Sequence, residues 1–278
     1  MLVRKKTLKG LPFIFLLVIH ISLLTYTFYK KENRKKVLIM LLNNIGFAYF
    51  FEYIIFTIFN SYSYQPRIVK NKSFDNTIGA IMSQAVFVPM TAVFITSFQL
   101  GWKVKMIFSL YFFLIERLFI KLSIFKTNWW RSLYTATLIP IYFAICTFWQ
   151  KKLNRQEPVV LFTTLVNSLI VINANIIYLL AFFRKIKFGK GHVRSWNEHF
   201  VISPLYTFCI SLLTVIAVRK NSFKTQLMGV LGIHYLLGKL NIIKTSFPFV
   251  LWTTSQILMF YIGVFFKKIA YEIGNSKK

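Results

Sequence analysis

Apolar residues along this chain gather in long blocks that are separated by short, mostly basic connections. Most blocks approach the roughly 20 residues that a helix needs to cross a bilayer. Nine blocks can be placed, at residues 11–29, 37–59, 78–100, 104–120, 132–149, 159–183, 200–218, 226–240 and 247–266. Because lipid offers the backbone no hydrogen-bond partners, each block is predicted to be a helix. The pattern therefore predicts an all-α integral membrane protein of about nine transmembrane helices.

Two of these blocks need a separate argument. Block 226–240 has an uninterrupted apolar core of only about 12 residues, a length that also suits a re-entrant segment. Block 11–29 follows a basic stretch, as the apolar part of a signal peptide would, but it is long for that role. The segment "KKENRKK" comes next, without a small-residue cleavage site. We therefore expect an uncleaved first helix.

One stretch of sequence occurs twice. "IKLSIFKTNWWRSLYT" (120–135) and "GKLNIIKTSFPFVLWT" (238–253) are identical at seven of sixteen positions, and each lies where one apolar block ends and the next begins. Extending the alignment pairs Pro89 with Pro204 and Asn44 with Asn167. The sequence thus predicts two tandem four-helix repeats, which are parallel because each holds an even number of helices. The predicted organisation is a basic segment with the first helix at 1–36, repeats at 37–153 and 159–268, and a basic tail at 269–278.

Composition agrees with a membrane protein and limits the partners. The chain is 56% hydrophobic and only 15% charged, unlike an ordinary soluble domain. Its net charge of +28 comes from small Lys and Arg clusters at helix ends, with no basic stripe of the kind that follows a nucleic acid. We expect these basic loops to meet anionic lipid headgroups, and we expect no nucleic-acid partner. Basic residues divide evenly between the two membrane faces, so the orientation stays open.

Acidic residues are scarce, and two of the seven lie inside apolar blocks. An ionised group there costs roughly 2.5–3.5 kcal/mol, so Glu52 and Glu116 should face the bundle interior and have partners. The repeat aligns Glu116 with His234 and Glu52 with Asn175, and helix parity places all four in the same half of the membrane. The two longest loops emerge on that side and carry Asp75, His192, Glu198 and His199.

Two interpretations of this polar set compete. In the first, Glu52 and Glu116 line a cavity between the two halves and bind a cation or carry protons, while His234 titrates near neutral pH. In the second, the polar residues hold helices together, with Glu52 paired to Arg117, the only Arg inside a predicted span. In that case Asn44, Asn167 and Asn175 would hydrogen-bond across helices.

The stretch "IERLFIKLSIFKTNWWRSLYT", followed by an apolar helix ending in "FWQKKL", resembles an uncharacterised family of small multi-pass membrane proteins of spore-forming Gram-positive bacteria. The resemblance covers about residues 11–153 and includes a Glu inside the fourth helix and a Trp opening the fifth. Here these are Glu116 and Trp129 or Trp130. The second half departs from it, with His234 opposite Glu116. The resemblance implies a membrane class and no activity.

Catalytic chemistry has no signature in the sequence. There is no H-E-x-x-H, no G-x-S-x-G, no phosphate-binding Gly loop and no Cys/His spacing for a metal, so we expect neither an enzyme nor a cofactor. We predict a structural or accessory protein of the bacterial cytoplasmic membrane, linked to sporulation if the resemblance holds. The alternative is a small proton- or cation-coupled transporter or sensor that uses Glu52, Glu116 and His234. A membrane-protein partner or a homo-oligomer fits either reading.

Overall fold

The computed structural model describes residues 10–191, 194–246 and 248–275, and the chain divides into two compact units, Met1–Asn154 and Arg155–Lys278. The basic start of the predicted N-terminal segment and His192 lie outside the described residues. Helices account for about 78% of the structure, and no described strand is longer than three residues. The prediction of an all-α protein is confirmed at this level.

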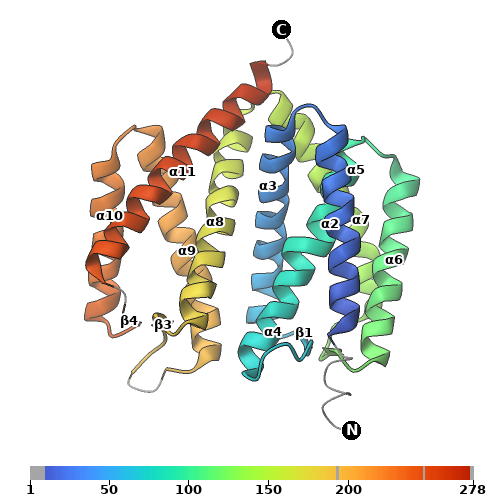
Figure 1. Cartoon of the computed structure of the whole chain (residues 1–278), viewed down its shortest axis with the longest axis horizontal. Coiled ribbons are helices and arrows are strands. Elements are labelled where there is room, and N and C mark those ends of the chain that lie inside the picture. Colours follow the sequence, from blue (N-terminus) through green and yellow to red (C-terminus); the bar gives the residue numbers. More distant parts are fainter. Residues whose placement is uncertain (1–9, 192–193, 247, 276–278) are drawn as a thin grey trace. The chain divides into compact units, whose positions relative to one another are not determined.

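Unit 1 is built mainly of helices (Figure 1). Its described part opens with one helix and continues with four more, two of which contain π-helical turns. The first helix is α2 (Leu11–Lys30). The second is α3 (Arg34–Glu52), which continues as the π-helix η1 (Tyr53–Ile58) and is followed by β1 (Tyr62–Tyr64); the third is α4 (Lys72–Ile81), which continues through the π-helix η2 (Met82–Phe87) into α5 (Val88–Ser97). The remaining elements are α6 (Trp102–Lys121), β2 (Phe125–Thr127) and α7 (Ser132–Asn154).

Unit 2 shows the order of elements that follows α2 in unit 1: helix, strand, two helices, strand, helix. Its elements are α8 (Pro158–Phe182), β3 (Ile186–Phe188), α9 (Trp196–Arg219), α10 (Phe223–Lys239), β4 (Ile243–Thr245) and α11 (Phe249–Asn275).

Each of the nine apolar blocks corresponds to one continuous helix of the described residues. Six of these helices are long and apolar enough to cross a membrane: Leu11–Lys30, Arg34–Ile58, Lys72–Ser97, Ser132–Asn154, Pro158–Phe182 and Trp196–Arg219. The weak block 226–240 corresponds to α10, which has 17 residues and is not among the six. The apolar helices therefore support a membrane protein.

Short strands form two antiparallel pairs that the hydrophobic pattern did not predict. β1 pairs with β2 in unit 1, and β3 pairs with β4 in unit 2. Strands β2 and β4 both follow a helix whose last turn closes around a residue in the left-handed conformation, Ser123 or Asn241, each at φ 54°. In both turns a backbone N–H reaches back five residues, from Ile124 to Phe119 at 3.0 Å and from Ile242 to Leu237 at 2.9 Å. The repeated stretch thus forms the same helix end and strand in both units.

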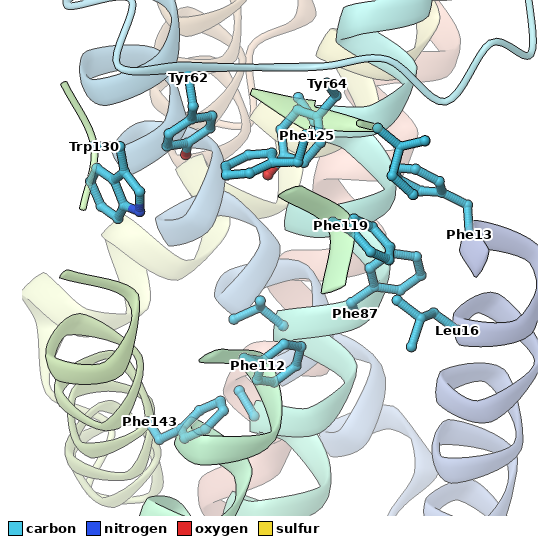
Figure 2. Close-up of a cluster of buried hydrophobic side chains, with 14 of the residues drawn as sticks. Phe13, Leu16, Tyr62, Tyr64, Phe87, Phe112, Phe119, Phe125, Trp130 and Phe143 are labelled. Carbon is cyan, nitrogen blue, oxygen red and sulfur yellow. The ribbon is translucent and has the colours of Figure 1, made fainter. Parts of the chain in front are cut away.

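Aromatic side chains build the core of unit 1 (Figure 2). Phe13 of α2 packs on Phe119 of α6 with ring centroids 4.8 Å apart, and on Phe87 of η2 at 6.3 Å. Deeper along α6, Phe112 meets Phe143 of α7 at 6.5 Å. These contacts fix α6 against its neighbours and so position the side chains that α6 presents to the interior.

The close approach of β1 to α4 yields the first prediction. A Cβ added at Gly79 would lie 2.3 Å from Cβ of Tyr64, so Gly79→Ala must displace the strand. We expect it to destabilise the protein by roughly 1–3 kcal/mol, the usual effect of overpacking. The measurement is thermal unfolding in detergent. The matched control is Gly232→Ala in α10, where an added Cβ meets nothing within 4 Å. Equal melting temperatures for both variants would contradict this packing.

Candidate functional site

Glu52 ends α3 and is buried, with 7% of its surface exposed. Its Oε2 accepts hydrogen bonds from the Tyr62 hydroxyl at 2.6 Å and from Nε2 of Gln84 at 2.9 Å. π-helical turns adjoin both ends of this contact, because η1 begins directly after Glu52 and η2 contains Gln84. π-helical turns often occur at functional sites. Pro89, which has no N–H for the preceding turn, closely follows η2.

The partners of Glu52 are neutral. Burial, with a smaller effect from the nearby Glu52 carboxylate, raises the pKa of the Tyr62 hydroxyl well above its ordinary value. Tyr62 therefore stays protonated and donates. Among the described residues Glu52 makes no ion pair with Arg117, whose side chain is exposed on α6. Adjacent helical residues point about 100° apart, so the helix that turns Glu116 inward turns Arg117 outward. The pairing that the sequence suggested is replaced by Tyr62 and Gln84.

Glu116 on α6 is engaged through one oxygen only. Its Oε2 accepts a hydrogen bond from the hydroxyl of Thr135 on α7, and Thr135 Oγ1 accepts one from Nε1 of Trp130 at 3.0 Å. Trp130, Thr135 and Glu116 thus form a directed chain, indole N–H to hydroxyl to carboxylate. The other oxygen of Glu116, Oε1, is buried and has no hydrogen-bond partner, and the same holds for Oε1 of Glu52.

A cavity of about 350 Å³ opens beside Glu116 within unit 1. Its walls are mostly Phe, Ile, Leu and Val, and none of the described residues that line it is a Lys, Arg or His. The polar side chains that line it are Tyr62, Tyr64, Ser83, Gln84, Glu116, Trp130, Thr135 and Tyr142. Figure 2 shows Tyr62, Tyr64, Phe125 and Trp130 gathered at one end of the aromatic cluster. Glu52 is reached from the cavity wall through Tyr62 and Gln84.

Unit 2 has a corresponding polar contact around His234. Its Nε2 lies 3.0 Å from Nε1 of Trp252 on α11, and it also contacts the hydroxyl of Tyr206 on α9. An indole N–H can only donate, so Nε2 accepts and the imidazole is neutral in this arrangement. Glu116 and His234 occupy aligned positions. Each accepts a hydrogen bond from the helix that follows it, Glu116 from Thr135 and His234 from Trp252. In the alignment of the repeats Thr135 corresponds to Thr253, the residue next to Trp252.

The asparagines divide between several environments. Asn175 donates to the carbonyl of Val171 on its own helix at 2.7 Å, and Asn167 is buried on α8. Asn173, which the sequence did not single out, bridges α8 and α9 by donating to Oγ of Ser211 at 2.8 Å. Asn44 is fully buried with both polar side-chain atoms unpartnered, while its backbone carbonyl accepts from Tyr142 at 2.8 Å.

Asp75, Glu198 and His199, which belong to the two longest loops of the sequence or lie beside them, serve local structure. Asp75 accepts three backbone N–H bonds from residues 67–69, at 2.7 to 3.1 Å. Glu198 completes a capping box with Ser195 at the start of α9. His199 accepts the N–H of Phe188 through Nδ1 at 3.1 Å. Within the described part of the chain, no three His, Cys, Asp or Glu side chains are grouped so that they could hold a metal.

Comparison with protein-family models, with curated proteins and with solved structures found no match.

The Trp130–Thr135–Glu116 chain yields the second prediction. Thr135→Val removes the donor to the partly buried carboxylate of Glu116, and we expect a loss of roughly 1.5–3 kcal/mol, the range for a hydrogen bond to a charged group. Thr137→Val is the control on the same helix, since the Thr137 hydroxyl is exposed and bonds only to carbonyls of its own helix.

A double-mutant cycle with Glu116→Gln measures the coupling of the two side chains. Neighbours in one hydrogen-bond network couple by roughly 0.5–3 kcal/mol. Thermal unfolding that gives additive effects for Thr135→Val and Glu116→Gln would show that the two groups do not interact.

Proposed function

We propose that the protein is an integral protein of the cell membrane whose unit 1 binds a small, mostly apolar molecule that carries a cationic group, as a transporter or a sensor does. The observation that carries the proposal is the buried, unpartnered Oε1 of Glu116 beside a cavity of about 350 Å³.

The half-engaged carboxylates favour binding over a purely structural role. A carboxylate that only holds helices together gains from using both oxygens, because each buried oxygen without a partner carries its full desolvation penalty. Glu52 and Glu116 each leave one oxygen unpartnered. A proton or a ligand cation supplies the missing partner.

The walls of the cavity suit a ligand with an apolar body. Small-molecule sites typically enclose about 300–1,000 Å³ and combine apolar walls with a few convergent polar groups. Aromatic faces attract cations, and the rings of Tyr62 and Trp130, whose centroids lie 5.3 Å apart, belong to the lining. Since no described lining residue is basic, an anionic ligand would find no cationic partner there and would be repelled by Glu116.

The two carboxylates take different parts in this proposal. Glu116 receives the cation through Oε1, while Thr135 and Trp130 orient its other oxygen. Glu52 does not line the cavity itself, but it accepts hydrogen bonds from two residues that do, Tyr62 and Gln84. A ligand that moves Tyr62 changes the hydrogen bonding of Glu52 and hence its affinity for a proton, which couples binding to protonation.

We further propose that all nine helices cross the membrane and that the two units are tandem parallel repeats. Both units pair the strand after their first shared helix with the strand that the repeated stretch forms. Their inward polar positions, Glu116 and His234, are aligned. The units differ in chemistry, because a neutral imidazole replaces the carboxylate in unit 2.

A structural or accessory role is the second candidate, and the satisfied cross-helix bonds favour it. Ser109 of α6 donates to the carbonyl of Ala136 on α7 at 2.7 Å, and Gln226 of α10 donates to that of Gln256 on α11 at 3.1 Å. Such bonds hold helices together and need no ligand.

The third prediction separates the two candidates. Phenethylamine should raise the melting temperature of the detergent-solubilised protein with increasing concentration, and 2-phenylethanol, of similar shape but uncharged, should not. Saturation at 100 times the dissociation constant corresponds to roughly 2.7 kcal/mol of stabilisation. Glu116→Gln should abolish the effect of the amine.

Glu32→Gln is the matched control for charge, because Glu32 is exposed. Equal responses to the amine and the alcohol, or an amine response that survives in Glu116→Gln, would refute the proposed site. If neither compound acts and Glu116→Gln only melts earlier, the structural role is the better account.

A further inference from the structure

A second cavity, of about 320 Å³, lies in unit 2 and has the opposite electrostatic character. It is lined by Arg184, Lys185, Lys187, Trp196, Lys244 and Ser246. Four of these six side chains are basic, and none is acidic. It lies where α8 ends, where α9 begins and along the β3–β4 pair, so it is found at helix ends.

The strand register places two like charges face to face. Lys187 of β3 and Lys244 of β4 are directly opposed in the antiparallel pair, an arrangement that destabilises a sheet. The corresponding pair of unit 1 is Ser63 and Lys126, which carries one charge only. The repulsion is therefore not required by the strand pairing itself, since the other unit forms the same kind of strand pair without it.

None of the described residues that line this pocket is an Asp or a Glu. Glu198 lies within electrostatic reach of Lys187, but it does not line the pocket, and its Oε2 is engaged by the N–H of Ser195 at 2.8 Å. The Nζ of Lys187 rests over the ring of Trp196, 4.5 Å from its centroid. That contact keeps the ammonium group beside the pocket and leaves its N–H bonds available to an anion.

We propose that this pocket binds a phosphate group, either the headgroup of an anionic lipid or a free phosphate compound. A bound anion would contact both Lys187 and Lys244 and so offset the repulsion between their ammonium groups. Arg184, held at the end of α8 in a left-handed conformation at φ 57°, adds a planar guanidinium that matches phosphate oxygens in pairs. Trp196 suits the interfacial depth at which lipid phosphates lie. The proposal stands apart from the ligand site of unit 1.

The test is thermal unfolding of the full chain with defined probes. In nonionic detergent the probes are inorganic phosphate and pyrophosphate, compared with sodium chloride at matched ionic strength. In nanodiscs the comparison is phosphatidylcholine alone against phosphatidylcholine with phosphatidic acid. Stabilisation by phosphate or pyrophosphate in detergent assigns the pocket to free phosphate compounds. Stabilisation by phosphatidic acid alone assigns it to a lipid headgroup.

Lys187→Ser is the informative variant because it recreates the charge pattern of unit 1. The substitution removes the repulsion from Lys244 and also the contact with Trp196, so the melting temperature without a probe is measured first and shows that the variant is folded. The affinity of Lys187→Ser for the phosphate probe should be at least tenfold lower than that of the wild type. Lys126→Ser, the equivalent change at a strand position of unit 1, should respond as the wild type does.

Three results would overturn the proposal. The first is the absence of stabilisation by any of the phosphate probes. The second is a loss of affinity that is equal in Lys187→Ser and Lys126→Ser, which would mark a general effect of net charge. The third is a folded Lys187→Ser protein that binds the probe with the affinity of the wild type.

Discussion

A buried polar group is stable only when it finds a hydrogen-bond partner within the protein, and this constraint is visible at the helix ends of this chain as well as at its buried side chains. Helices α6, α8 and α10 each close their last turn around a left-handed residue and pass directly into a strand that pairs with another. Carbonyls and N–H groups that a helix end would otherwise expose are thereby bonded. Strand β1 also places the Tyr62 hydroxyl within hydrogen-bonding distance of Glu52. The strand pairing that satisfies backbone groups therefore also supplies a donor to one oxygen of the buried Glu52 carboxylate.

The carboxylates extend the same physical argument to function. Tyr62 and Gln84 satisfy one oxygen of Glu52, and Thr135 satisfies one oxygen of Glu116. The remaining oxygen of each is buried without a partner, in a unit that also contains a largely apolar cavity. In unit 2 the aligned position carries His234, which accepts from Trp252, and the charged pocket lies instead at the helix ends. The two units therefore share one order of helices and strands but differ in the polar residues that they place at the cavity and at the helix ends.

Much of the helical arrangement could be predicted from the sequence, because long apolar runs must be helical in lipid. The strands could not be, since three residues such as Ile186–Phe188 are too few to show an alternating pattern. The repeated stretch did contain a signal, for Ser123 and Asn241 occupy the left-handed position in its two copies. Glu52, Glu116 and His234 were identified because charged or titratable groups are rare inside apolar blocks. Gln84 and Thr135 were missed because hydroxyl and amide side chains are common there, and only the folded chain shows which of them meets a carboxylate.

The proposed ligand site depends on Oε1 of Glu116, which is buried without a hydrogen-bond partner. Labelling with dicyclohexylcarbodiimide, a lipophilic reagent for buried carboxyl groups, tests it most directly when the modified residues are identified by mass spectrometry. The account predicts that Glu116 is labelled, and that phenethylamine slows its labelling while 2-phenylethanol leaves the rate unchanged. Labelling of Glu116 at the same rate with and without the amine would contradict it.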